Sequence, residues 1–148
     1  MALTMERPAL MAFLASDFSE VADDFVVERV DESGLDLRLR VASRHLRPGG
    51  TVSGPAIFAL ADVAVYLAIL SQIGPKALTV TTSASIDFLR KPAAGADLIG
   101  TARILKLGRV LAVGDVLIFS DGLPEPVARA TLTYAIPPDL PYTNGPFN

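Results

Sequence analysis

The chain has 148 residues, of which 51% are hydrophobic, and its formal net charge at pH 7 is −3. This length suits one domain with one apolar core, and the acidic balance argues against nucleic-acid binding. The sequence has no cysteine and a single histidine, which excludes disulfides, thiolate nucleophiles and multi-histidine metal sites. So much apolar surface predicts an oligomer, because one protomer alone would leave part of it in water.

The first predicted element is a short amphipathic helix over residues 8–23, where apolar side chains recur at helical spacing. The proline at its start is tolerated in the first turn of a helix. Glu6, Arg7 and Pro8 interrupt the apolar stretch before it, so the N-terminus is not typical of a signal peptide. We therefore expect a cytoplasmic protein.

Residues 25–42 predict a β-hairpin, with a turn at Ser33-Gly34 followed by strict alternation of apolar and charged side chains. The alternation indicates that one face of the hairpin is buried. A loop rich in glycine, proline and serine follows at residues 43–53. His45 lies in this loop, and we expect it to be exposed.

The longest apolar stretch, residues 55–73, predicts a helix that ends at Gly74-Pro75. It is apolar on nearly every side, so we expect the rest of the chain to enclose it. Its length approaches that of a transmembrane helix, but Asp62 near its middle would cost about 2.5–3.5 kcal/mol in a bilayer. We therefore predict a buried helix of a soluble protein, with no membrane partner.

Four strand-like runs follow this helix, at residues 77–90, 96–106, 109–120 and 126–136. The short turns between them predict an antiparallel meander, and residues 137–148 are typical of a loose tail. The order of elements predicts a single α+β domain over residues 1–148, with its core at about 20–136. Its expected architecture is the hotdog fold: a curved antiparallel sheet wrapped around one long central helix, with a short N-terminal helix.

Asp62 is unusual, because ionised carboxylates rarely stay in apolar surroundings without a partner or a chemical task. Two turns before it, Gly54 begins the helix, where free N–H groups and the helix dipole favour negative charge. Without a Cβ, Gly54 lets a ligand approach the backbone closely. Pro55 disfavours helical angles at the preceding residue, so we predict Gly54 as the cap and Pro55 as the first helical residue.

Two stretches of the chain resemble the hotdog acyl-CoA thioesterases, in particular their phenylacetic-acid-degradation branch: GTVSGPAIFALADVAVYLA and SIDFLRKPAAGADLIGTARI. The resemblance covers roughly residues 20–136. In that family the helix opens with His-Gly-Gly, and an acidic residue follows nine positions after the His. In this chain Ser53, Gly54 and Pro55 stand at the triplet, and Asp62 stands at the acid.

The resemblance implies hydrolysis of an acyl-CoA thioester at a site that two protomers share. The Gly54 N–H would polarise the thioester carbonyl, and Asp62 of the facing protomer would attack it or activate water, assisted by Thr81. The spacing agrees with a shared site, because Gly54 and Asp62 of one helix lie roughly 10 Å apart along its axis. Coenzyme A would enter as part of the substrate, without a separate cofactor, and the homodimer would pair into a tetramer.

Further residues are predicted to contact the substrate, at the helix start, on the helix face around Asp62 and at the end of the next strand: Arg47, Ser53, Pro55, Phe58, Tyr66, Arg90 and Lys91. Arg47 stands where the family often has an asparagine. Phe58 and Tyr66 could line an acyl pocket, or they could equally be ordinary core. The charges after the strand could meet the phosphates of coenzyme A, or they could be simple surface charge.

Other interpretations stay open. Asp62 could be a structural acid, and the hydroxyl row of residues 79–85 could be a solvated strand face. Because Ser53 replaces the family histidine, the main alternative is a non-catalytic hotdog module that binds acyl-CoA or lipid. A hotdog dehydratase or hydratase would need a catalytic histidine near the acid, and His45 lies 17 positions before Asp62.

Overall fold

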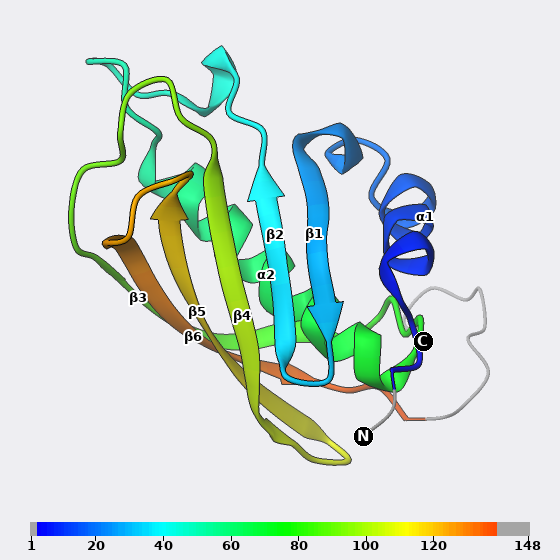
Figure 1. The fold of residues 1–148 in the computed structure, drawn as a ribbon. Helices are drawn as coiled ribbons and strands as arrows, with labels where there is room; N and C mark the ends of the chain where they lie inside the picture. Colours follow the sequence, from blue (N-terminus) through cyan, green and yellow to red (C-terminus); the bar gives the residue numbers. More distant parts are fainter. Residues whose placement is uncertain (1–2, 139–148) are drawn as a thin grey trace, which may run out of the picture.

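The computed structural model describes residues 3–138, which form one antiparallel sheet and two α-helices. The helices are α1 (Arg7–Asp17) and α2 (Gly54–Ile73), and the strands are β1 (Phe25–Asp31), β2 (Gly34–Leu39), β3 (Val80–Phe88), β4 (Leu98–Leu107), β5 (Leu111–Ser120) and β6 (Pro126–Ala135). Figure 1 shows the curved sheet in front of α2, with α1 beside β1. This architecture confirms the predicted hotdog fold. Most of the predicted tail, at 139–148, lies outside the described residues.

The N-terminal helix is shorter than the predicted span of 8–23. It ends at Phe18, whose backbone angles (φ −130°, ψ 46°) are no longer helical, and a single 3-10 turn over Ala22–Asp24 then leads into β1. The apolar face of α1 is buried through Leu10, Phe13 and Leu14. The predicted helix ran too far because some residues between α1 and β1 are also apolar, so the helical spacing of apolar residues continues there.

The hairpin of β1 and β2 matches its prediction, with the turn between Asp31 and Gly34. The Asp31 carboxylate closes this turn, because its Oδ1 accepts from the N–H groups of Ser33 at 2.8 Å and Gly34 at 3.1 Å. The alternating leucines of β2 all lie in the core, as expected: Leu35, Leu37 and Leu39.

The long helix α2 is enclosed over its C-terminal half, where every residue from Ala64 to Ser71 is buried, and it ends at Gly74, whose φ of 97° only glycine adopts easily. By length and composition it could cross a membrane, but 61% of its most apolar window is buried inside the fold. Its start differs from the prediction. Ser53 is the N-cap, since its side chain accepts from the Ala56 N–H, and Gly54 is already helical.

The strand order is β1-β2-β4-β5-β6-β3, so the predicted four-strand meander is wrong for β3. Strands β4, β5 and β6 do form a meander, but β3 pairs with β6 at the far edge of the sheet. The connection from β3 to β4 spans residues 89–97 and crosses to the other side of that meander. A connection of this length does not force its two strands to be neighbours, in contrast to a tight turn.

Glycines in the sheet bring α2 close to it. A Cβ at Gly114 of β5 would stand 2.7 Å from Cγ1 of Val65, and one at Gly100 of β4 would stand 3.4 Å from Cγ of Leu60. Ala64 of α2 faces the same contact with only a methyl group. The helix therefore rests directly on the backbone of the central strands, which holds its N-terminus at a defined distance from the sheet.

Candidate active site

The first turn of α2 carries one backbone donor without an acceptor. The Ala56 N–H donates to Oγ of Ser53 at 3.3 Å, the Ile57 N–H donates to the Ser53 carbonyl at 3.0 Å, and Pro55 has no N–H. The Gly54 N–H has no acceptor within residues 3–138. Because it lies at the positive end of a 20-residue helix, this N–H is suited to polarise a carbonyl oxygen.

The side chain of Phe88, at the end of β3, lies over this helix start. Its Cζ is 3.4 Å from the point where a Cβ of Gly54 would stand, and the side chain is still 55% exposed. Phe88 therefore forms a wall beside the free N–H. Phe88 was not among the predicted site residues, because its contact with Gly54 spans 34 positions of the chain.

The loop before α2 is held by His45, which is buried at 9% exposure and not exposed as predicted. Its carbonyl accepts from the Ser53 N–H at 2.8 Å, its Nδ1 accepts from the Ala42 N–H at 2.9 Å, and its Nε2 faces Oδ2 of Asp24 at 3.3 Å. With Nδ1 acting as an acceptor, the proton of the neutral ring sits on Nε2 and points at Asp24. His45 thus links the end of β2 to the cap of α2.

We expect the stability of the protein to fall below about pH 6.5 because of His45. Burial, and secondly the nearby Arg44, lower the pKa of His45 in the folded state. A histidine with a lowered folded pKa stabilises the fold above its unfolded pKa and loses that contribution as the pH falls. Protonation would also turn Nδ1 into a donor that faces the Ala42 N–H.

Urea unfolding at pH 8.0, 6.5 and 5.5 measures the effect on stability, and His45→Gln should flatten its pH dependence. An equally steep dependence in His45→Gln would contradict this assignment.

Asp62 lies in α2 two turns after Gly54 and is half-buried. Its Oδ1 accepts from Oγ1 of Thr81 on β3 at 2.8 Å and from the hydroxyl of Tyr134 on β6 in a short contact. The structure therefore brings together two of the predicted residues, Asp62 and Thr81. Tyr134 was missed, although its alternating position on the last strand indicated a side chain facing α2.

The predicted lining residues Phe58 and Tyr66 both pack against the core, and Tyr66 is buried. The Tyr66 hydroxyl donates to the Ala77 carbonyl at 3.1 Å, and its ring lies 5.5 Å from that of Phe18. Burial, and secondly the charge of Asp17, raise the pKa of Tyr66 to about 12. Tyr66 is therefore a core residue of the described chain.

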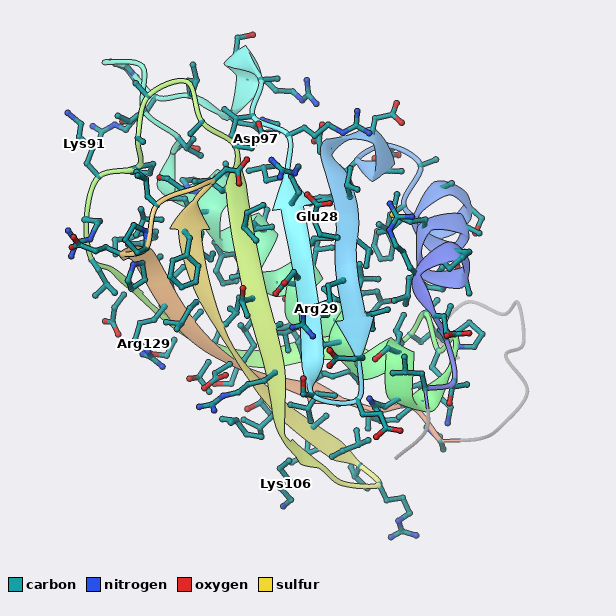
Figure 2. The ribbon with its side chains drawn as sticks, in the orientation of Figure 1. Glu28, Arg29, Lys91, Asp97, Lys106 and Arg129 are labelled. Carbon is teal, nitrogen blue, oxygen red and sulfur yellow. The ribbon has the colours of Figure 1, made fainter. Side chains whose placement is uncertain are left out.

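The charged residues that were predicted to contact the substrate, Arg47, Arg90 and Lys91, lie in the loops around the start of α2. Arg47 is exposed in the turn that its N–H closes by donating to the Thr51 carbonyl. Arg90 forms an ion pair with Glu125 at 2.7 Å. Lys91 is exposed in the connection from β3 to β4, and Figure 2 shows it at the opposite end of the molecule from Lys106.

A cavity of about 570 Å³ lies at the other end of α2 and is lined by Ile73, Lys76, Gly108, Arg109, Val110, Ile136, Pro137 and Pro138. None of the predicted site residues lines it. The candidate site is therefore the surface that Gly54, Phe88, Asp62 and Thr81 present near β3, at the N-terminal half of α2.

A curved sheet around one enclosed helix, with a free N–H at the helix start, defines a hotdog-fold protein of the thioesterase type. The family model of the thioesterase superfamily matches residues 49–127, which is more than half of the chain. The chain belongs to the thioesterase superfamily. The matched segment contains the helix start, Asp62 and Thr81.

Solved structures agree with this membership. A crystal structure from Silicibacter sp., provisionally named a thioesterase, is 52% identical, covers 93% of this chain and 96% of its own, and superposes with a TM-score of 0.87. A variant of the phenylacetic acid degradation protein PaaI from Thermus thermophilus is 27% identical, with coverage of 80% and 98% and a TM-score of 0.68. A hypothetical thioesterase from Streptococcus pneumoniae, solved with coenzyme A, shares the fold at 22% identity, with coverage of 86% and 96% and a TM-score of 0.72. The family membership and the 52% identical structure support a hydrolase-type enzyme.

Proposed function

We propose that the protein hydrolyses the thioester bond of an acyl-CoA. The observation that carries the proposal is the Gly54 N–H at the start of α2, which has no acceptor among the described residues, in a chain of the thioesterase superfamily. Thioester hydrolysis builds negative charge on the carbonyl oxygen, and a preorganised N–H at a helix start stabilises that charge. The thioester carbonyl oxygen would accept from Gly54, and the acyl group would lie against Phe88.

Asp62 supplies the second part of the chemistry. Its Oδ1 is held by two hydroxyl donors, so Oδ2 is the oxygen that can act on a substrate. As a general base, Asp62 takes a proton from water while the water oxygen bonds to the carbonyl carbon. The carbon–sulfur bond then breaks, the thiolate takes up a proton, and the products are a carboxylic acid and coenzyme A. As a nucleophile, Asp62 would instead form an anhydride that water hydrolyses.

The site requires two protomers in this proposal. Gly54 and Asp62 of one chain are eight residues apart in α2, about 12 Å along its axis, too far to act on the same carbonyl group. Within residues 3–138, strand β3 is an edge of the sheet with nearly every residue exposed, and Val80 is 53% exposed. Long exposed edge strands are normally covered. Antiparallel pairing of two β3 strands would cover this edge and bring Asp62 of one chain toward Gly54 of the other, with further pairing into a tetramer.

Val80→Lys is expected to break the β3 interface, to halve the mass of the assembly and to abolish hydrolysis, since a charge on an edge strand opposes strand pairing. Light scattering after gel filtration measures the mass, and circular dichroism checks that the variant is folded. Val110→Lys is the matched control, because Val110 is equally exposed (58%) but lies in the turn between β4 and β5. A Val80→Lys protein that stays dimeric and active would rule out this interface.

Coenzyme A is the proposed thiol component, as a part of the substrate and not as a cofactor. Two observations support it: a protein of the same fold was solved with coenzyme A, and two cations near the helix start have no ion-pair partner within residues 3–138. These cations are Arg47 and Lys91, and phosphate groups are natural partners for them. Arg90 is engaged with Glu125, so we assign it a lesser part.

A panel of aliphatic and aromatic acyl-CoA esters tests the proposal, with the released thiol followed by a thiol-specific dye. The protein contributes no background to this measurement because it has no cysteine. Saturable thiol release from at least one ester is the expected result. Tight binding of the esters without release would overturn the proposal in favour of a non-catalytic acyl-CoA-binding module.

A further inference from the structure

Two neighbouring strands each direct a hydroxyl group at the same carboxylate oxygen. Tyr134 of β6 is paired with Thr81 of β3 in the sheet, and both side chains donate to Oδ1 of Asp62. The Tyr134 hydroxyl also lies 2.6 Å from the main-chain carbonyl oxygen of Asp62. Tyr134 therefore contacts both the side chain and the backbone of the proposed catalytic acid.

The two donors differ in how firmly they are held. Thr81 is exposed on the edge strand, whereas Tyr134 is only 2% exposed and its ring packs 6.1 Å from that of Tyr66. A buried ring on a strand that is paired on both sides cannot turn away from Asp62 without displacing its neighbours. Tyr134 is therefore the rigid member of the pair.

The consequence for Asp62 is a fixed carboxylate plane. Oδ1 accepts two hydrogen bonds, while Oδ2 has no donor within residues 3–138. A free aspartate samples several rotamers, and each wrong one removes the acid from the reacting carbon. Holding Oδ1 from the sheet side leaves Oδ2 as the oxygen without a hydrogen bond within residues 3–138.

Tyr134 can keep this role over the whole working pH range. Burial, and secondly the negative charge of Asp62, raise the pKa of Tyr134 well above its ordinary value. The hydroxyl thus keeps its proton and stays a donor. It is not a source of protons for the leaving group.

We propose that Tyr134 is the positioning residue of this site: its hydroxyl orients the Asp62 carboxylate so that Oδ2 faces the thioester. The proposal rests on the proposed hydrolase function. Tyr134 touches no substrate in this scheme and acts only through Asp62.

The test is Tyr134→Phe, which removes the hydroxyl and keeps the ring. We expect kcat to fall by about 10-fold to 100-fold with KM within twofold of wild type, because the acid is misplaced while substrate binding is not. Ser71→Ala is the matched control, because it also deletes a buried hydroxyl. The Ser71 hydroxyl lies on α2 and donates to the Ala68 carbonyl at 2.6 Å. This variant should leave kcat unchanged.

A double-variant cycle separates positioning from general loss of structure. Adding Tyr134→Phe to Asp62→Asn should lower kcat no further, because the hydroxyl then has no catalytic acid to orient. Additive losses in the double variant, or a wild-type kcat in Tyr134→Phe beside an inactive Asp62→Asn, would overturn the positioning role and leave the hydrolase function standing.

A crystal structure of Tyr134→Phe decides the question independently of turnover. We expect the Asp62 carboxylate to leave its wild-type rotamer or to occupy several. An unchanged rotamer would overturn the proposal. If wild type itself releases no thiol from any ester, the proposed function fails, and the structure of the variant still shows whether Tyr134 orients Asp62.

Discussion

Asp62→Asn is expected to lower kcat for acyl-CoA hydrolysis by about 10³-fold, the largest effect of any single substitution in this chain. Asparagine has nearly the same shape, and its amide oxygen can still accept from Thr81 and Tyr134. The fold and the position of the side chain should therefore be kept. What is lost is the second carboxylate oxygen, which becomes an NH₂ group that can neither take a proton from water nor attack a carbonyl. Steady-state kinetics with the best ester of the panel measures the loss.

Asp115→Asn is the control for this experiment. Asp115 is a carboxylate of β5 that pairs with Arg103 at 2.9 Å, and it contacts none of the site residues. Its replacement should change kcat by less than about twofold, since a partly exposed ion pair contributes little. An Asp62→Asn protein with wild-type kcat would show that Asp62 is a structural acid.

Gly54→Pro is expected to lower kcat by about 10²-fold to 10³-fold, as removal of one oxyanion donor does in other hydrolases. Proline has no N–H, and three features favour it at this position. The Gly54 N–H has no acceptor to lose within residues 3–138, the preceding Ser53 is extended (φ −73°, ψ 155°), and the first helical positions tolerate proline. Because residue 54 is helical and precedes Pro55, a Cβ there should make the first turn less stable, which circular dichroism and the unfolding midpoint measure.

Gly54→Ala is the matched control, because it adds a Cβ but keeps the N–H. That Cβ would stand 3.4 Å from Cζ of Phe88, an ordinary contact, so any loss caused by crowding appears in both variants. The difference between the proline and alanine variants then reports on the N–H and on access to it, because the proline ring puts Cδ where the hydrogen was. Equal kcat values in the two variants would contradict the role of the Gly54 N–H.

Much of the fold follows from local patterns. The bounds of α2 were predictable because Pro55 and Gly74 mark its ends and the stretch between them is too apolar to be exposed. Asp62 was identifiable because a lone acid in that stretch needs a partner. Thr81 was predicted only through the family resemblance, and the structure places it against Asp62.

The rest depended on contacts between distant parts of the chain. Strand periodicity does not tell which strands pair, so the position of β3 beside β6 could not be derived from the turns. The partner of Asp62 on β6, Tyr134, is 72 positions away, and the burial of His45 depends on Asp24, 21 positions earlier. The cap was misassigned for a local reason. The prediction placed the cap at Gly54 because a residue before proline disfavours helical angles. In the structure the Ser53 side chain accepts from the Ala56 N–H, so Ser53 is the cap.

Mixing two inactive proteins, Asp62→Asn and Gly54→Pro, under conditions that let subunits exchange tests whether two protomers share each site. If each site takes its acid from one subunit and its N–H from the other, a mixed dimer contains one intact site and one doubly defective site. An equimolar mixture should then recover about one quarter of wild-type activity, since half of the dimers are mixed. If both groups came from the same chain, every site would lack one of them. A mixture that exchanges subunits yet stays inactive would contradict the shared site.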